Sequence, residues 1–193
     1  MSIIVDPQEI RIVGENSFIR LAEREGGGFS TRASHWRVLF SPEGPGHVLF
    51  LQSELTENRV VVYADNIALA RRLQEEIEVQ LHAPFADTSL PVVDATFQRE
   101  GSIHSFVAER VVSEDGDVVL TWYDFMEPFL FNHPAGVQGR TLSVYSVFFP
   151  ARRAQLTLGG RVAAGRPVPM ERGGREATSC CLAWAESWLK PRG

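Results

Sequence analysis

The residues of this sequence that can support acid–base chemistry lie on either side of Asp115-Gly116. This dipeptide stands between two apolar runs and favours a two-residue β-hairpin turn, because both central residues of that turn need positive φ. With Asp115-Gly116 as the loop, pairing outward along the two strands places His104 opposite Glu127. A glutamate can orient a histidine and hold its pKa near neutrality, as general acid–base catalysis requires. The sequence therefore makes His104 and Glu127 a candidate catalytic pair.

The same hairpin face would supply the walls of a site for an apolar substrate. Tyr123 is a third candidate catalytic residue, because its side chain would lie beside the His104–Glu127 pair. Aromatic side chains exclude water and hold an apolar ligand. The candidate ligand-binding residues of this face are Phe106, Arg110 and Phe125. The alternative is that His104 and Glu127 form an ordinary surface ion pair at a strand end.

The opposite face of the hairpin carries a second candidate site. In the expected register Glu109 and Asp124 are diagonal neighbours, about 7–8 Å apart, and Trp122 beside them is a further candidate ligand-binding residue. Two carboxylates in a partly apolar site raise the pKa of one of them, as acid–base dyads require. The alternative is that these carboxylates pair with Arg99 or Arg110, or face solvent.

Two long loops add candidate binding residues. His133 lies in the loop 132–139, and Arg140 follows that loop directly. The segment 159–178 holds four arginines and two Gly-Gly pairs. It is either an arginine-bearing lid over a site or a pair of short exposed hairpin turns. Because a guanidinium is a planar fork that matches carboxylate or phosphate, Arg140 and the arginines of 159–178 are candidates for holding an anionic group.

Charge is distributed unevenly along the chain. Residues 1–139 hold 10 arginines against 21 acidic residues (net −11), whereas residues 140–193 hold 9 basic against 3 acidic residues (net +6). The basic segment either captures an anionic ligand or pairs with the acidic remainder of the fold. Nucleic-acid binding is not expected, because nucleic-acid-binding domains are usually basic as a whole. The single lysine, Lys190, stands near the chain end and is a poor candidate for lysine chemistry.

These residues need a β framework to position them. Segments rich in Val, Ile and aromatic residues recur about every 10 residues and are separated by Gly, Pro, Asn or Asp. They are 17–25, 35–41, 47–54, 59–64, 92–100, 103–113, 118–127 and 141–149. The pattern predicts a mainly β protein: one domain, residues 1–193, folded as an antiparallel β-barrel of about eight to ten strands. In architecture alone this barrel is similar to the calycin-type ligand-binding barrels, and the chain carries no motif of that family.

One segment has helical periodicity. Between Asn66 and Leu81 the apolar residues fall three or four apart, and the charged residues, Glu78 among them, gather elsewhere. Asp65 or Asn66 can cap the start, and Pro84 ends the segment. We expect one amphipathic helix packed on the barrel. The 103–127 hairpin is apolar on both faces, so one face should meet the barrel core and the other the helix, a ligand or a second subunit.

The C-terminal segment is expected to close the barrel. In Ser179–Leu189 every second residue from Cys180 to Trp188 would share one strand face, although Leu182, Ala185 and Leu189 would also suit a helix. Cys180 and Cys181 are adjacent and point to opposite faces of a strand, so they form neither a disulfide nor a metal pair. With no signal or membrane-spanning segment, we expect a cytoplasmic protein with reduced thiols and no membrane association. The missing metal- and nucleotide-binding motifs predict no metal and no cofactor.

Three functional hypotheses follow. In the first, the barrel mouth binds a small apolar or amphipathic molecule whose anionic group meets Arg140 or an arginine of 159–178. In the second, the protein is a metal-independent isomerase or hydrolase that uses His104–Glu127 or Glu109–Asp124. In the third, it is an interaction module that forms a homodimer through the second apolar face of the hairpin.

Overall fold

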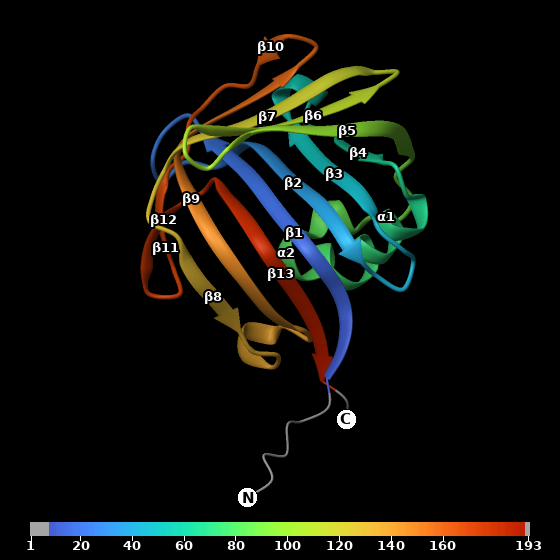
Figure 1. Ribbon diagram of the computed structural model, residues 1–193. Coiled ribbons are helices and arrows are strands. Elements are labelled where there is room, and N and C mark those ends of the chain that lie inside the picture. Colours follow the sequence, from blue (N-terminus) through green and yellow to red (C-terminus); the bar gives the residue numbers. More distant parts are fainter. Residues whose placement is uncertain (1–7, 192–193) are drawn as a thin grey trace, which may run out of the picture.

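The structure is a computed structural model that describes residues 8–191, and its strands form one closed barrel (Figure 1). Nine strands make the wall in the order β9-β13-β1-β2-β3-β4-β5-β6-β7, and β7 pairs with β9 to close it. These strands are β1 (Gln8–Ala22), β2 (Phe29–Phe40), β3 (Gly46–Ser53), β4 (Val60–Ala64), β5 (Val92–Ser102), β6 (Phe106–Ser113), β7 (Gly116–Phe125), β9 (Ser143–Leu158) and β13 (Cys181–Pro191). The predicted β-barrel is confirmed, and so is the closing C-terminal strand.

One pairing in the wall is parallel. Eight of the nine neighbouring pairs are antiparallel, whereas β4 and β5 run in the same direction. Parallel neighbours need a crossover connection. Here the crossover is one helical segment made of α1 (Ile67–Leu73), a π-helical turn (Gln74–Glu78) and α2 (Val79–Leu81). Short 3-10 turns occupy Glu54–Thr56, Ala83–Ala86 and Val137–Gly139.

The remaining strands extend the barrel at its margins. The strand β8 (Phe129–His133) pairs with the first half of β9, and β10 (Arg161–Val162) pairs with the end of β9. A separate hairpin consists of β11 (Pro169–Arg172) and β12 (Arg175–Thr178). The segment 159–178 therefore turns at both Gly-Gly pairs, where all four glycines have positive φ. This confirms the hairpin interpretation of the segment.

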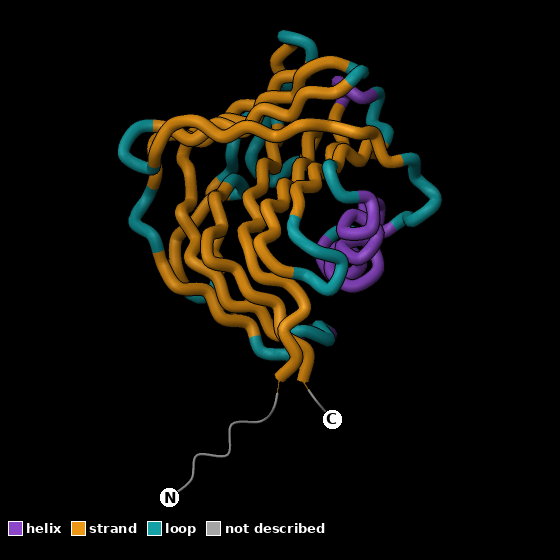
Figure 2. Tube along the Cα trace, turned by 45° about the vertical axis from the view of Figure 1, so that its right-hand side comes forward, coloured by secondary structure: helices purple, strands orange, loops and turns teal. Residues whose placement is uncertain are grey.

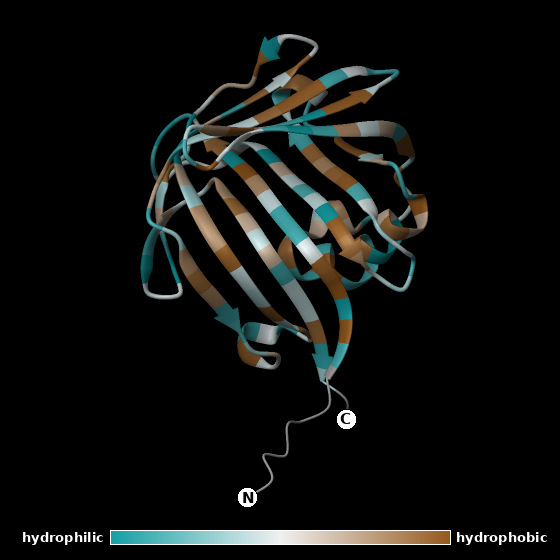
Figure 3. Cartoon of the chain, viewed as in Figure 1, coloured by the Kyte–Doolittle hydropathy of each residue, from teal (hydrophilic) through white to brown (hydrophobic). Residues whose placement is uncertain are grey.

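Side chains inside the barrel form the main core. Apolar and polar residues alternate along the wall strands (Figure 3), and every wall strand contributes buried residues to the interior. Trp122 and Leu182 are buried there, together with Cys180. Cys181 lies on the outer side of the same strand and packs with Phe18 and Phe148. The two thiols therefore point to opposite faces, as predicted.

A second core lies outside the barrel, between its wall and the helical segment (Figure 2). Leu69, Leu73 and Ile77 are fully buried against the outer face of β2 and β3, which presents Trp36 and Phe50. The Oδ1 of Asn66 accepts a hydrogen bond from the backbone N–H of Leu69 at 3.1 Å, so the predicted N-cap is confirmed.

The π-helical turn changes the orientation of one predicted surface residue. The sequence places Glu78 with the charged residues on the solvent side, but its side chain is 1% exposed. In a π-helix each hydrogen bond spans five residues, so each residue advances by a smaller angle than in an α-helix. Over residues 74–78 this difference accumulates and turns Glu78 toward the barrel wall.

The predicted register of the β6–β7 hairpin is wrong by two residues. The loop is Glu114-Asp115, and the pairs are Ser113 with Gly116, Glu109 with Leu120, and Phe106 with Tyr123. The Oγ of Ser113 accepts the Asp115 backbone N–H at 3.2 Å, and this local bond fixes the turn one residue earlier than predicted. Because side chains alternate with a period of two, the shift leaves the paired residues, as far as Phe106 and Tyr123, on their predicted faces. Beyond them the alternation breaks at Asp124, where φ is 57°, and Phe125 packs against the interior core. The helix covers β2 and β3, not this hairpin, and Phe106 on the outer face is 39% exposed.

We predict that Leu73→Ala lowers the free energy of unfolding by about 2–5 kcal/mol, because it removes buried methyl groups between the helix and the barrel wall. Val79→Ala on the same helical segment is the control, since Val79 is 53% exposed, and its effect should stay within about 0.5 kcal/mol. Urea unfolding followed by Trp fluorescence measures both. Equal effects of the two substitutions would contradict the packing described here.

Candidate functional site

The structure does not bring His104 and Glu127 together. His104 lies in the turn between β5 and β6, and Glu127 lies in the loop between β7 and β8. Both side chains are exposed, and no hydrogen bond or ion pair joins them among the described residues. The shifted register ends the β6–β7 ladder at Phe106 and Tyr123, before either residue is reached.

Three other candidates of that hairpin face, Phe106, Arg110 and Tyr123, lie on the outside of the barrel. Arg110 pairs with Asp117 across the hairpin, and the guanidinium of Arg153 lies 4.9 Å from the ring centre of Tyr123. These contacts are typical of a solvated outer sheet face, where charged side chains cover aromatic rings. Phe125 differs, because it is half-buried and packs against the interior core of the barrel.

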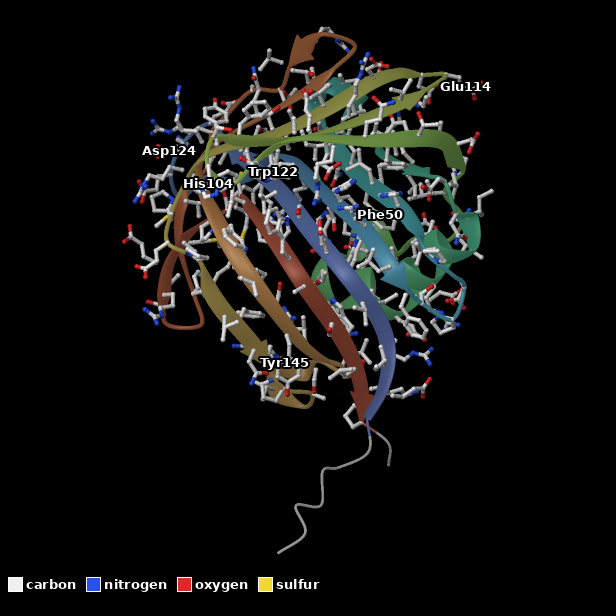
Figure 4. All side chains as sticks on the ribbon, viewed as in Figure 1. Phe50, His104, Glu114, Trp122, Asp124 and Tyr145 are labelled. Atoms are coloured by element: carbon white, nitrogen blue, oxygen red, sulfur yellow. The ribbon has the colours of Figure 1, made fainter. Side chains whose placement is uncertain are left out.

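The two carboxylates of the second candidate site are separated. Glu109 points into the barrel, is 2% exposed and forms an ion pair with Arg99, which also binds Glu15 at 2.5 Å. Burial raises the pKa of Glu109, and the nearby Arg99 opposes this shift. Asp124 is exposed and lies 3.7 Å from Arg152. Figure 4 shows Asp124 at the edge of the molecule.

Trp122 is a core residue. It is fully buried in the barrel, and its Nε1–H donates to the backbone oxygen of Phe18 at 3.0 Å. The bond satisfies the one polar atom of the indole side chain, as burial requires. Trp122 therefore holds the barrel interior together across β7 and β1.

The barrel mouth itself is a broad cleft of about 810 Å³ beside the parallel β4–β5 pair. Its lining is largely apolar and includes Leu55, Val61, Tyr63, Val93 and Leu158. Arg59 is the arginine at this cleft, and neither Arg140 nor an arginine of 159–178 lines it. The two parts of the predicted ligand site, an apolar mouth and an arginine from those segments, thus lie in different places.

Arg140 lines a different cavity, on the outside of the barrel. This cavity of about 150 Å³ lies where β1, β9 and β13 are covered by α2, β8 and the β11–β12 hairpin. Four aromatic rings line it: Phe18, Phe131, Phe148 and Trp188. Four charged side chains reach it: Arg20, Arg140, Arg172 and Glu186. We call it the arginine cavity. His133 lies near its margin, with its ring centre 6.3 Å from that of Phe131.

Three chain segments bring the arginines together. Arg20 comes from β1, Arg172 from β11, and Arg140 from the connection between β8 and β9. Each guanidinium stacks on an aromatic ring: Arg20 lies 5.3 Å and Arg172 lies 4.8 Å from the ring centre of Phe18, and Arg140 lies 5.9 Å from that of Trp188. Arg172 belongs to the 159–178 segment, so that segment contributes an arginine to a site as well as forming hairpins.

The arginines of the cavity have no acidic partner in the part of the chain that the structure describes. Within residues 8–191, no ion pair joins Arg20, Arg140 or Arg172 to a carboxylate. The Nε and Nη2 atoms of Arg172 are buried and have no hydrogen-bond partner among these residues. Burial, together with the positive charges of Arg172 and Arg32, lowers the pKa of Arg20 to about 10. Burial also lowers the pKa of Arg172 and of Arg140.

A β-bulge turns Glu186 into this cavity. The sequence places Cys180, Leu182, Trp184, Glu186 and Trp188 on one strand face. The pairing of β13 shifts between Trp184 and Ser187, and Ala185 has φ of 52°. An extra residue in a strand reverses the alternation beyond it. Trp184 therefore packs against the barrel core, whereas Glu186 and Trp188 lie on the outer side.

The carboxyl group of Glu186 is held within the cavity wall. Glu186 is 3% exposed, and the Nε1–H of Trp188 donates to its Oε1 at 2.6 Å. Burial raises the pKa of Glu186 to about 8, against the opposing effects of the Trp188 and Ser146 hydrogen bonds and of Arg140. At neutral pH the group is mostly uncharged, so it does not neutralise the arginines.

Glu78 lies in an adjoining small cavity that shares Asn16, Phe18 and Arg20 with the arginine cavity. Its Oε1 accepts hydrogen bonds from the Ser34 hydroxyl at 2.7 Å and from Trp36 Nε1 at 2.8 Å. Burial raises the pKa of Glu78. These bonds tie the π-helical turn to β2.

Part of this site is predictable from the sequence, which makes Arg140 and the arginines of 159–178 candidate anion-binding residues. The sequence gives no indication of Arg20 and Glu186 in the cavity, or of Glu78 in the adjoining one. An arginine at position 20 between Ile19 and Leu21 is a weak sequence signal, because it has the spacing of an ordinary outward-facing residue. No sequence pattern reveals the β-bulge or the π-helical turn that orient the two glutamates.

Comparison with known proteins gave no match: no family model, curated protein or solved structure resembles this chain significantly. The described residues contain no helix with the length and hydrophobicity to cross a bilayer, and no cluster of three or more His, Cys, Asp or Glu side chains suited to a metal ion.

We predict that the free energy of unfolding falls as pH rises from about 4.5 to about 8. In this range Glu186 is ionised in the unfolded chain but still protonated in the folded protein, so rising pH favours unfolding. Glu186→Gln removes this contribution. Between pH 6 and pH 8 the variant should gain about 2 kcal/mol relative to the wild-type protein, from the 1.4 kcal/mol that one proton contributes per pH unit. Urea unfolding at both pH values measures the difference. A difference that does not change with pH would show that Glu186 is already ionised at pH 6.

Proposed function

We propose that this protein binds a small organic anion with an apolar body in the arginine cavity. The observation that carries the proposal is the convergence of three arginines, Arg20, Arg140 and Arg172, on an aromatic-walled cavity, with no carboxylate of residues 8–191 paired to any of them. Buried charges are normally paired, because desolvating an unpaired charge is expensive. An anionic ligand would supply the missing partner.

The lining indicates the shape of the ligand. Guanidinium groups bind carboxylate, sulfonate or phosphate oxygens through paired N–H donors. The aromatic rings Phe18, Phe131 and Phe148 would contact an apolar body. A volume of about 150 Å³ admits a group the size of a single aromatic ring. A larger ligand would place its anionic head in the cavity and its tail outside.

The ligand class is the one that the sequence suggests, but the proposed site is the arginine cavity and not the barrel mouth. The barrel-mouth cleft provides apolar surface but lacks these arginines. The enzyme alternative has less support, because its two candidate pairs, His104–Glu127 and Glu109–Asp124, do not meet. Binding is therefore the function that the geometry supports best.

Benzenesulfonate is a suitable probe, because it stays anionic at all relevant pH values. We expect it to bind the wild-type protein by calorimetry at pH 6.5, and we expect its neutral isostere benzenesulfonamide to bind at least tenfold more weakly. Arg172→Gln should weaken benzenesulfonate binding about tenfold or more, because a hydrogen bond to a charged group contributes about 1.5–3 kcal/mol.

Arg175→Gln is the matched control. Arg175 pairs directly with Arg172 in the β11–β12 hairpin, but its side chain is exposed and does not line the cavity. This variant loses the same charge from the same hairpin and should bind benzenesulfonate as the wild type does. Equal weakening by both substitutions, or equal binding of the sulfonate and the sulfonamide, would refute the proposed site.

A further inference from the structure

The arginine cavity contains a carboxyl group as well as three guanidinium groups. Glu186 lines the same cavity wall as Arg20, Arg140 and Arg172, and its carboxyl group is buried. The Trp188 indole uses one carboxyl oxygen, Oε1. No arginine forms an ion pair with either oxygen of Glu186 among the described residues. The carboxyl group therefore stands within the cavity as an alternative partner for the same cations that would hold a ligand.

Two negative charges cannot share a cavity of about 150 Å³ at low cost, because like charges at short range in a poorly solvated site repel strongly. When Glu186 is ionised, it neutralises part of the arginine charge and repels an entering anion. When Glu186 is protonated, the arginines are uncompensated. We propose that anion binding in the arginine cavity is coupled to uptake of one proton by Glu186, so that the protein binds its anion at neutral pH and releases it in alkaline conditions.

This inference rests on the proposed anion-binding function and adds its regulation. The charged and titratable groups that face Glu186 from the surrounding elements are Arg20 of β1, Arg140, Arg172 of β11, Glu78 of the helical segment and Cys181 of β13. The nearby His82 has its pKa lowered to about 4, mainly by burial, and stays neutral above pH 6. Burial raises the pKa of the Cys181 thiol far above neutrality. Glu78 is thus the main competing titratable group, and it requires its own control.

The wild-type protein provides the first test. With a pKa of about 8 for Glu186, the neutral fraction falls from nearly all at pH 6.5 to about one quarter at pH 8.5. The apparent affinity for benzenesulfonate should fall about fourfold over this range, in proportion to that fraction. Calorimetry at pH 8.5 in buffers of different ionisation enthalpy should show uptake of most of one proton per bound anion. Uptake at pH 6.5 should be close to zero.

Two variants assign the proton. Glu186→Gln keeps an oxygen for the Trp188 N–H and cannot ionise, so it should bind benzenesulfonate equally at pH 6.5 and 8.5 without proton uptake. Glu78→Gln keeps the acceptor for Ser34 and Trp36, and it should retain the proton uptake and the fourfold change. Loss of uptake in Glu78→Gln with retention in Glu186→Gln would overturn the assignment.

The outcomes separate the two proposals. If the wild-type protein binds benzenesulfonate with one affinity at both pH values and takes up no proton, the coupling is wrong and the anion site stands. If benzenesulfonate binds at neither pH, the proposed function itself fails. The measurement of proton uptake uses the unaltered protein, so it remains decisive even if Glu186→Gln does not fold.

Discussion

The barrel wall formed by β1, β2 and β3 is apolar on both faces, and the rest of the molecule is arranged to keep both faces from water. Inside, the wall strands bury their own core around Leu49 and Trp122. Outside, Trp36 and Phe50 require a cover, which the helical segment provides with Leu69 and Leu73. Because this cover is also the crossover from β4 to β5, the parallel pair and the second core have one cause.

The arginine cavity forms where that cover is incomplete. The helical segment ends at Leu81, and the cavity is lined by Leu81 of α2, Phe131 of β8 and Arg172 of the β11–β12 hairpin. Three separate covers cannot pack as tightly as one continuous element, and the side chains between them are arginines and aromatic residues. The stacking of Arg20 and Arg172 on Phe18 stabilises the cations without neutralising them. This leaves a positive, poorly solvated site suited to an anion.

Two local irregularities of the backbone orient the carboxyl groups in and beside the arginine cavity. The π-helical turn directs Glu78 inward, and the bulge at Ala185 directs Glu186 outward from the barrel. Each irregularity accommodates one extra residue, the first in a helix and the second in a strand. Such irregularities are often found at functional sites. Here they place Glu186 in the arginine cavity and Glu78 in the adjoining cavity that shares Arg20 with it, and burial raises the pKa of both carboxyl groups.

The sequence by itself determined the barrel, the amphipathic helix with its Asn66 cap and the C-terminal closing strand, because alternation and helical periodicity are local properties of the chain. It also made Arg140 and the arginines of 159–178 candidates for holding an anionic group. The tertiary structure alone decided the location of the site and most of its members. Arg20, Arg140, Arg172 and Glu186 meet only because β1, β9, β13 and the β11–β12 hairpin pack together, and such long-range contacts leave no periodic signal. The hairpin register, the β-bulge and the π-helical turn each depend on a shift of one or two residues, which hydrophobic patterns cannot resolve.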